Sequence, residues 1–154
     1  MTIFIRTIGL SVALAAAFGS AQGADNKLPE AAANILAKAD TIELLALDPE
    51  PAKEGFRGYK ILGKTELKGD AKKGLMAAFE KGSEGPIDPA KCFNPRHGLR
   101  ATHDGKTVEL VICFECAQFK VHMGDDKGQT LLVNKMPQAA FDKALKDAGI
   151  DKSK

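Results

Sequence analysis

The chain has 154 residues and a formal net charge of +2, from 22 basic and 20 acidic side chains. This length suits one domain with a single hydrophobic core. The charges are balanced and alternate along the chain. The composition therefore excludes the basic surface patch by which proteins bind nucleic acids or anionic membranes.

The first 23 residues have the composition of a secretory signal peptide. One cation, Arg6, precedes an apolar run at residues 8–18, and small residues at the −3 and −1 positions fit cleavage after Gly23. The apolar run is too short to span a bilayer stably, although an N-terminal anchor that is never cut is the alternative interpretation. We therefore expect an exported protein, periplasmic or secreted, whose mature domain is residues 24–154. After signal removal we expect no association with a membrane.

The first half of that domain alternates between helical and extended patterns. Two prolines, Pro49 and Pro51, predict the end of the first strand, because proline cannot donate to a sheet ladder. Gly82 is the expected helix stop before a turn-rich connection. The order is helix, strand, strand and helix, at residues 28–39, 41–47, 59–66 and 70–81.

The second half predicts two hairpins and a closing helix. Asp104-Gly105 is a dipeptide that two-residue hairpin turns prefer, and it lies between extended patterns. The segments are strands at 98–103, 106–116, 119–123 and 129–134, and a helix at 137–148. The whole chain therefore predicts an α+β fold, with a mostly antiparallel sheet of about five or six strands and helices packed on one face.

The Asp104-Gly105 turn also predicts a register for the first hairpin. It places Thr102 opposite Thr107 and Arg100 opposite Glu109, which matches side chains across the strands. Extended outward, the same register places His97 opposite Ile112 and brings Cys92 to the level of Cys116, although proline disturbs the ladder there.

The apolar positions change parity near the end of the long strand. They are even from Val108 to Cys116 and odd from Phe119 onward, which predicts a bulge, twist or break around residues 116–118. In an unbroken strand Cys113 and Cys116 would point to opposite faces. The expected irregularity is what would let both sulfurs converge.

Three interpretations of the cysteines stay open. The first is a structural disulfide, with Cys92–Cys116 as the favoured pairing and Cys113 buried, since an exported chain with three cysteines permits one bridge and one further sulfur. Closing about 25 residues would contribute about 3 kcal/mol. The second is a zinc or copper site formed by Cys92, His97, Cys113 and Cys116, although Arg96 opposes a cation there. The third is thiol–disulfide exchange through Cys113 and Cys116, a pair that here ends a strand instead of opening a helix.

The polar residues between Cys92 and the first hairpin are candidates for ligand binding. Asn94, Arg96 and His97 could hold an anion beside the sulfurs. The alternative is that Arg96 pairs with a glutamate, Glu115 or Glu109.

No catalytic motif accompanies these candidates. His103 and His122 are expected to be exposed surface histidines, and the sequence has no phosphate-binding glycine loop, G-x-S-x-G or H-E-x-x-H segment. We therefore expect a binding or interaction domain for a small ligand or a protein partner, without catalytic activity and without a cofactor unless the cysteines hold zinc or copper.

The segments CFNPRHG, at residues 92–98, and CFEC, at residues 113–116, resemble a group of small exported bacterial proteins. Members of that group share a C-F-x-P-R-H-G segment followed, after a hairpin, by C-F-E-C. The resemblance spans most of the mature chain and implies that the two cysteine segments form one unit. It implies no activity, substrate or cofactor.

Overall fold

The computed structural model describes residues 26–153, which form three helices and six strands. The predicted signal peptide at 1–23 lies outside the described residues. In chain order the elements are α1 (Glu30–Lys38), β1 (Thr41–Phe56), β2 (Tyr59–Lys68), α2 (Gly69–Gly82), β3 (His97–His103), β4 (Lys106–Cys113), β5 (Gln118–Met123), β6 (Gln129–Leu132) and α3 (Gln138–Asp147).

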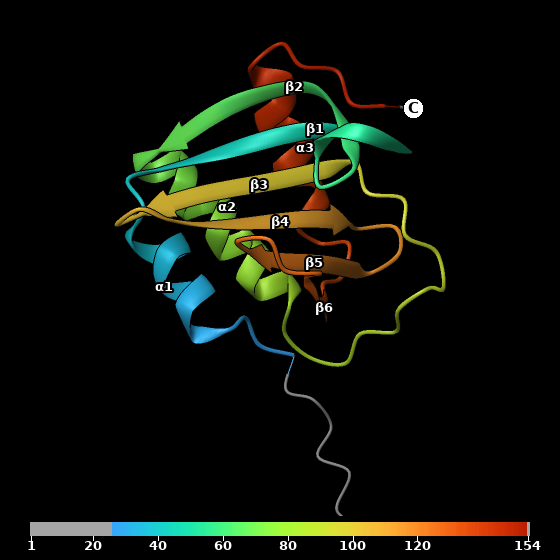
Figure 1. Ribbon diagram of the computed structural model, residues 1–154, viewed down its shortest axis with the longest axis horizontal. Coiled ribbons are helices and arrows are strands. Elements are labelled where there is room, and N and C mark those ends of the chain that lie inside the picture. The colour runs from blue at the N-terminus through green and yellow to red at the C-terminus, as the bar shows by residue number, and fades with distance from the viewer. Residues whose placement is uncertain (1–25, 154) are drawn as a thin grey trace, which may run out of the picture.

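The six strands make one antiparallel sheet with the order β2-β1-β3-β4-β5-β6, and the helices pack against one of its faces (Figure 1). The predicted α+β class, element order and one-sided helix layer are therefore confirmed. Among residues 26–153, no helix has the length and apolar content to cross a membrane.

The hairpin of β3 and β4 has the predicted register. Thr102 lies opposite Thr107, with 2.9 Å between their hydroxyl oxygens, and Arg100 lies opposite Glu109. Asp104 and Gly105 have φ values of 48° and 71°, as a two-residue turn with two left-handed positions requires. The ladder therefore brings His97 opposite Ile112, also as predicted.

Strand β1 does not end at the prolines, so the predicted end of that strand is wrong. It continues to Phe56 through three register shifts against β2, which lie between residues 46 and 56. Irregular pairing of this kind tolerates proline, because the missing N–H need not join a regular ladder. The extra length forms an arm, residues 48–58, that turns at Arg57-Gly58 and reaches back over the sheet.

The sequence predicts that this strand ends at Cys116, but β4 ends at Cys113. Residues 114–117 are a four-residue turn, here called the β4–β5 turn, and Cys113 lies opposite Gln118. Across a four-residue turn, even-numbered residues of β4 lie opposite odd-numbered residues of β5. This explains why the apolar positions change from even to odd numbers along the sequence. The predicted irregularity is thus a hairpin turn, whose last residue, Ala117, has a φ of 54°.

The main hydrophobic core lies between the helices and one face of the sheet. One row of side chains crosses four strands there, and all its members are at most 2% exposed: Leu44, Leu99, Leu110 and Val121. Phe79 from α2 packs edge-on against Phe119, with 5.0 Å between ring centroids. We call this side of the sheet the helix-covered face.

The opposite face, which we call the arm face, carries a much smaller apolar cluster of Leu45, Leu47, Phe56 and Val111. Phe56 belongs to the arm, and its ring covers Gly98 of β3. A Cβ atom at Gly98 would lie 2.8 Å from the Phe56 ring, closer than real contacts allow. The glycine of the CFNPRHG segment therefore leaves space for the arm.

Candidate functional site

The three cysteines meet where the β4–β5 turn faces the connector, residues 83–96, which joins α2 to β3 without regular structure. Figure 1 shows the connector passing along the end of the sheet that holds this turn. The turn folds Cys116 back over Cys113, and the two form a disulfide with 5.3 Å between their Cα atoms. The Cys116 N–H also donates to the Cys113 sulfur at 3.2 Å.

Cys92 completes the cluster from the connector. Its Sγ lies 2.6 Å from the Cys116 Sγ, so the predicted approach of Cys92 to the second cysteine segment is confirmed. The favoured pairing, Cys92–Cys116, differs from the bond in the structure, which joins Cys113 and Cys116. The difference arises because residues 114–117 form a turn instead of strand, which reverses the direction of the Cys116 side chain. Cys92 is exposed, whereas Cys113 and Cys116 are 1% and 0% exposed.

Several contacts besides the sulfurs hold the connector on the sheet. The Ala90 N–H donates to the Cys116 carbonyl at 3.1 Å, and the Gln118 side chain donates to the Ala90 carbonyl. Nearer to β3, the Leu47 N–H donates to the Arg96 carbonyl at 3.0 Å. The connector is therefore attached at the β4–β5 turn and also at β1.

Phe114 fixes the β4–β5 turn from the other side of the sheet. Its ring is 3% exposed and packs edge-on against Phe141 of α3 and His97 of β3, with centroid separations of 5.1 and 5.3 Å. A turn that projects a buried aromatic side chain into the core has little freedom to move. The sulfurs of Cys113 and Cys116 are thus presented from a rigid part of the fold.

His97 lies in the helix-covered face and not among the sulfurs. Its register partner is Ile112, so alternation along β4 places it on the side opposite to Cys113. Its Nε2 lies 2.9 Å from one carboxylate oxygen of Asp142, and Lys152 donates to the other. Burial lowers the pKa of His97, and the Asp142 carboxylate opposes part of that shift.

The predicted metal ligands are therefore only partly brought together. Cys92, Cys113 and Cys116 converge, whereas His97 is held by Asp142 on the other face. Within residues 26–153, no group of three or more histidine, cysteine, aspartate or glutamate side chains is arranged to hold a metal ion.

The predicted ligand-binding residues are neighbours, but the space between them is small. Asn94, Arg96 and His97 line a depression of about 10 Å³, which has room for about one water molecule. Arg96 pairs at 3.0 Å with Glu115, one of the two glutamates that the sequence offered. The other, Glu109, pairs with Arg57 and Arg100.

The two remaining histidines differ from each other. His103 lies at the hairpin turn with a third of its side chain exposed. The prediction that His122 is exposed is wrong, because residues 124–128 fold back so that Gly128 lies against its ring. In that loop Asp126 accepts backbone N–H groups of Met123 and Gly128, and the bond from Met123 is the main cause of its lowered pKa.

A charge network on the arm face was only partly visible in the sequence. The predicted pair of Arg100 and Glu109 is present at 2.7 Å. Arg100 also reaches Glu43 at 3.1 Å, and Arg57 at the tip of the arm reaches Glu109. Register identifies the first pair, but the contact of Arg57 depends on how the arm bends, which no local pattern encodes.

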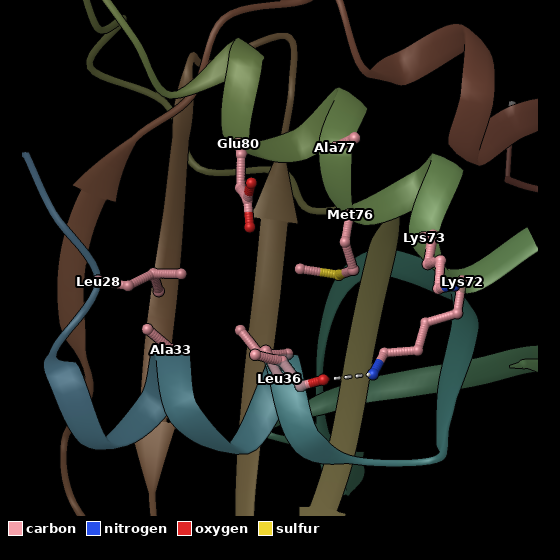
Figure 2. Close-up of a pocket in the computed structure, with 9 residues that line it drawn as sticks. Leu28, Ala33, Leu36, Lys72, Lys73, Met76, Ala77 and Glu80 are labelled. Atoms are coloured by element: carbon pink, nitrogen blue, oxygen red, sulfur yellow. Dashed lines mark hydrogen bonds between the residues drawn. The ribbon is translucent and has the colours of Figure 1, made fainter. Parts of the chain in front are cut away.

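A groove between α1 and α2 was not predicted at all. It has a volume of about 240 Å³, and an adjoining cavity of about 330 Å³ shares three of its lining residues. Figure 2 shows Leu36 and Met76 facing each other across it, with Glu80 toward one end and the lysines toward the other. Lys72 crosses the groove and donates from its Nζ to the carbonyls of Ala37 and Ala39 at the end of α1.

No protein-family model, no curated protein and no solved structure matches this chain. The resemblance of CFNPRHG and CFEC to a group of small exported bacterial proteins stays a prediction. We therefore infer a function from the geometry of the site.

Proposed function

We propose that the chain is an exported, non-catalytic binding domain in which the cysteine cluster holds the connector on the sheet. One observation carries the proposal: the sulfur of Cys92, an exposed residue, lies 2.6 Å from the Cys116 sulfur of a buried disulfide, at the point where the connector meets the β4–β5 turn. The backbone bond from Ala90 to Cys116 supports the same attachment.

The energetic role of the cluster can be measured directly. A bridge between Cys113 and Cys116 closes four residues and contributes about 2 kcal/mol in the chain-entropy picture, whereas Cys92–Cys116 closes 25 and contributes about 3 kcal/mol. We expect reduction of the full chain to lower the free energy of unfolding by an amount in that range, measured by urea denaturation. An unchanged free energy of unfolding after reduction would rule out a structural bridge.

The groove between α1 and α2 is the surface that we assign to a ligand. Apolar side chains line its middle, and the exposed Lys73 stands at one end, away from Glu80 at the other. Such a site suits a small molecule with an apolar body and one anionic group, since pockets of this kind combine apolar walls with a few placed charges.

The probe for this groove is 1-anilinonaphthalene-8-sulfonate, which has an apolar body and one anionic group. Ala77 lines the groove, so Ala77→Phe fills it, whereas Ala71 is exposed on the same helix and does not line it. We expect Ala77→Phe to reduce the fluorescence titration signal at least fivefold and Ala71→Phe to leave it unchanged. Equal signals from the two variants would show that the probe binds elsewhere.

The second candidate function is metal binding by the reduced cluster. It is supported by the convergence of three sulfurs, because thiolates are the ligands that copper(I) and zinc favour. The test is a competition titration of the reduced chain with a copper(I)–bicinchoninate complex and with zinc. Stoichiometric uptake that Cys92→Ser abolishes supports this function, and uptake below one equivalent for both metals excludes it.

A further inference from the structure

We propose that Cys92, Cys116 and Cys113 form an intramolecular thiol–disulfide exchange site, in which one disulfide alternates between two pairings that share Cys116. The proposal rests on the proposed function, since it concerns the same cluster, and it says how the connector becomes attached and released. It concerns a covalent reaction within the chain, with no external substrate.

The positions of the sulfurs support the exchange. Cys116 is bonded to Cys113, and its Sγ also has the Cys92 Sγ at 2.6 Å. Cys92 is exposed, so its thiol can lose a proton to solvent and supply the thiolate that attacks a disulfide. The attacked sulfur and the attacking sulfur are therefore already in contact in the folded protein.

The leaving sulfur is also provided for. The Cys116 N–H donates to the Cys113 Sγ at 3.2 Å, and this donor can stabilise negative charge on Cys113 once its bond is broken. Cys113 is 1% exposed, so without such a donor a buried thiolate would be costly.

The two partners differ in local structure, which an exchange can use. Phe114 anchors the β4–β5 turn in the core, while Cys92 belongs to a connector without helix or strand. Small shifts of the connector can bring the Cys92 sulfur into bonding distance or withdraw it, without disturbing the sheet.

The reaction balances without an oxidant or a reductant. The Cys92 thiolate attacks the Cys116 sulfur, the Cys92–Cys116 bond forms, and the Cys113–Cys116 bond breaks with its electron pair moving to Cys113. The Cys113 thiolate then takes a proton from solvent, which replaces the proton that Cys92 released. One disulfide and one thiol are present before and after the step.

The two pairings have different consequences for the fold. In the Cys113–Cys116 pairing the free thiol is exposed, and the connector is held by hydrogen bonds and packing. In the Cys92–Cys116 pairing the connector is covalently attached to the β4–β5 turn, and the free thiol is buried at Cys113. A thiol-reactive molecule therefore reacts at Cys92 and traps the chain with its connector unattached.

The test is to map the free thiol in the native full chain. Acid stops the exchange, and excess N-ethylmaleimide in urea near neutral pH then labels whichever cysteine is free; peptide mass spectrometry locates the label. We expect label on both Cys92 and Cys113 in different molecules. After long incubation of the native protein with the same reagent, we expect the Cys113-labelled fraction to fall at least tenfold and Cys92 to carry nearly all the label.

Two outcomes would overturn the exchange while leaving the attachment proposal standing. Label confined to Cys113 in the acid-quenched sample would mean a single pairing that attaches the connector, and a Cys113-labelled fraction that persists would mean two static forms. Label confined to Cys92, or three labelled cysteines in one molecule, would overturn both proposals.

The variants Cys92→Ser and Cys113→Ser are a matched pair for this experiment. Each removes one competitor for Cys116, so each should form its single disulfide completely in a glutathione redox buffer and show no free thiol. Two free thiols in folded Cys113→Ser would show that Cys92 cannot bond to Cys116 and would overturn the proposal.

Discussion

The two faces of the sheet are built in different ways. The helix-covered face buries apolar side chains from β1, β3, β4, β5 and β6 against three helices. The arm face buries four apolar residues and otherwise carries a charge network, the arm and the connector. Removal of apolar surface from water drives folding, so the helix-covered face supplies most of the stability. The arm face holds distant segments in position through particular pairs of side chains.

The largest expected effect compares the same substitution on the two faces. Phe79 and Phe56 are 0% and 1% exposed, on the helix-covered face and the arm face respectively. Phe79→Ala should lower the free energy of unfolding by about 4–5 kcal/mol, and Phe56→Ala by about 3 kcal/mol, because the arm can settle into the space. Urea denaturation measures both. An equal or larger loss at Phe56 would contradict the comparison.

The charge network should matter less than the core but more than a surface pair. Glu109 is nearly buried and accepts from both Arg57 and Arg100. Glu109→Gln should cost about 1–3 kcal/mol, because Arg57 loses its charged partner and Arg100 keeps only Glu43. The control is Glu115→Gln, whose pair with Arg96 is more exposed and should contribute at most about 1 kcal/mol. Equal losses in the two variants would show that the network holds nothing in place.

Two glycine-to-alanine changes should have opposite signs. At Gly98 the added methyl group meets the Phe56 ring, so Gly98→Ala should cost about 1–3 kcal/mol. Gly74 lies exposed in α2 with no heavy atom within 4 Å of a Cβ, so Gly74→Ala should stabilise by about 0.5–1 kcal/mol. Thermal unfolding of the two variants checks both signs, and stabilisation by Gly98→Ala would mean that the arm does not rest on β3.

The smallest expected effect is a pH dependence from His97. Burial holds its pKa in the folded state below the ordinary value of about 6.5, so the unfolded chain binds more protons between the two values. The contribution of His97 to the free energy of unfolding should therefore be constant above about pH 6.5. Below that pH it should fall as the pH decreases, by at most about 1.4 kcal/mol for each pH unit. His97→Gln should flatten the profile below about pH 6.5. A profile that keeps its slope in His97→Gln would show that His97 is not its source.

The sequence predicted most of the framework because local chemistry specifies it. The Asp104-Gly105 turn and the pair of Thr102 and Thr107 define the β3–β4 register. That register in turn predicts that Cys92 lies near Cys116. The α+β class follows from the order of helical and extended patterns.

The remaining features depend on contacts between distant residues. The arm continues past Pro51 because β2 pairs with it irregularly, and the β4–β5 turn forms where Phe114 finds a place in the core. His122 is buried because a later loop folds over it. These outcomes come from tertiary packing, which overrides the local pattern.

The most direct test of the central claim, that the cysteine cluster holds the connector on the sheet, is hydrogen exchange at the Ala90 amide. This amide donates to the Cys116 carbonyl, whereas the Leu99 amide belongs to the centre of the sheet. We predict that reduction of the native chain accelerates exchange at Ala90 at least tenfold and leaves Leu99 protected. Unchanged exchange at Ala90 after reduction, or equal acceleration at both amides, would contradict the account.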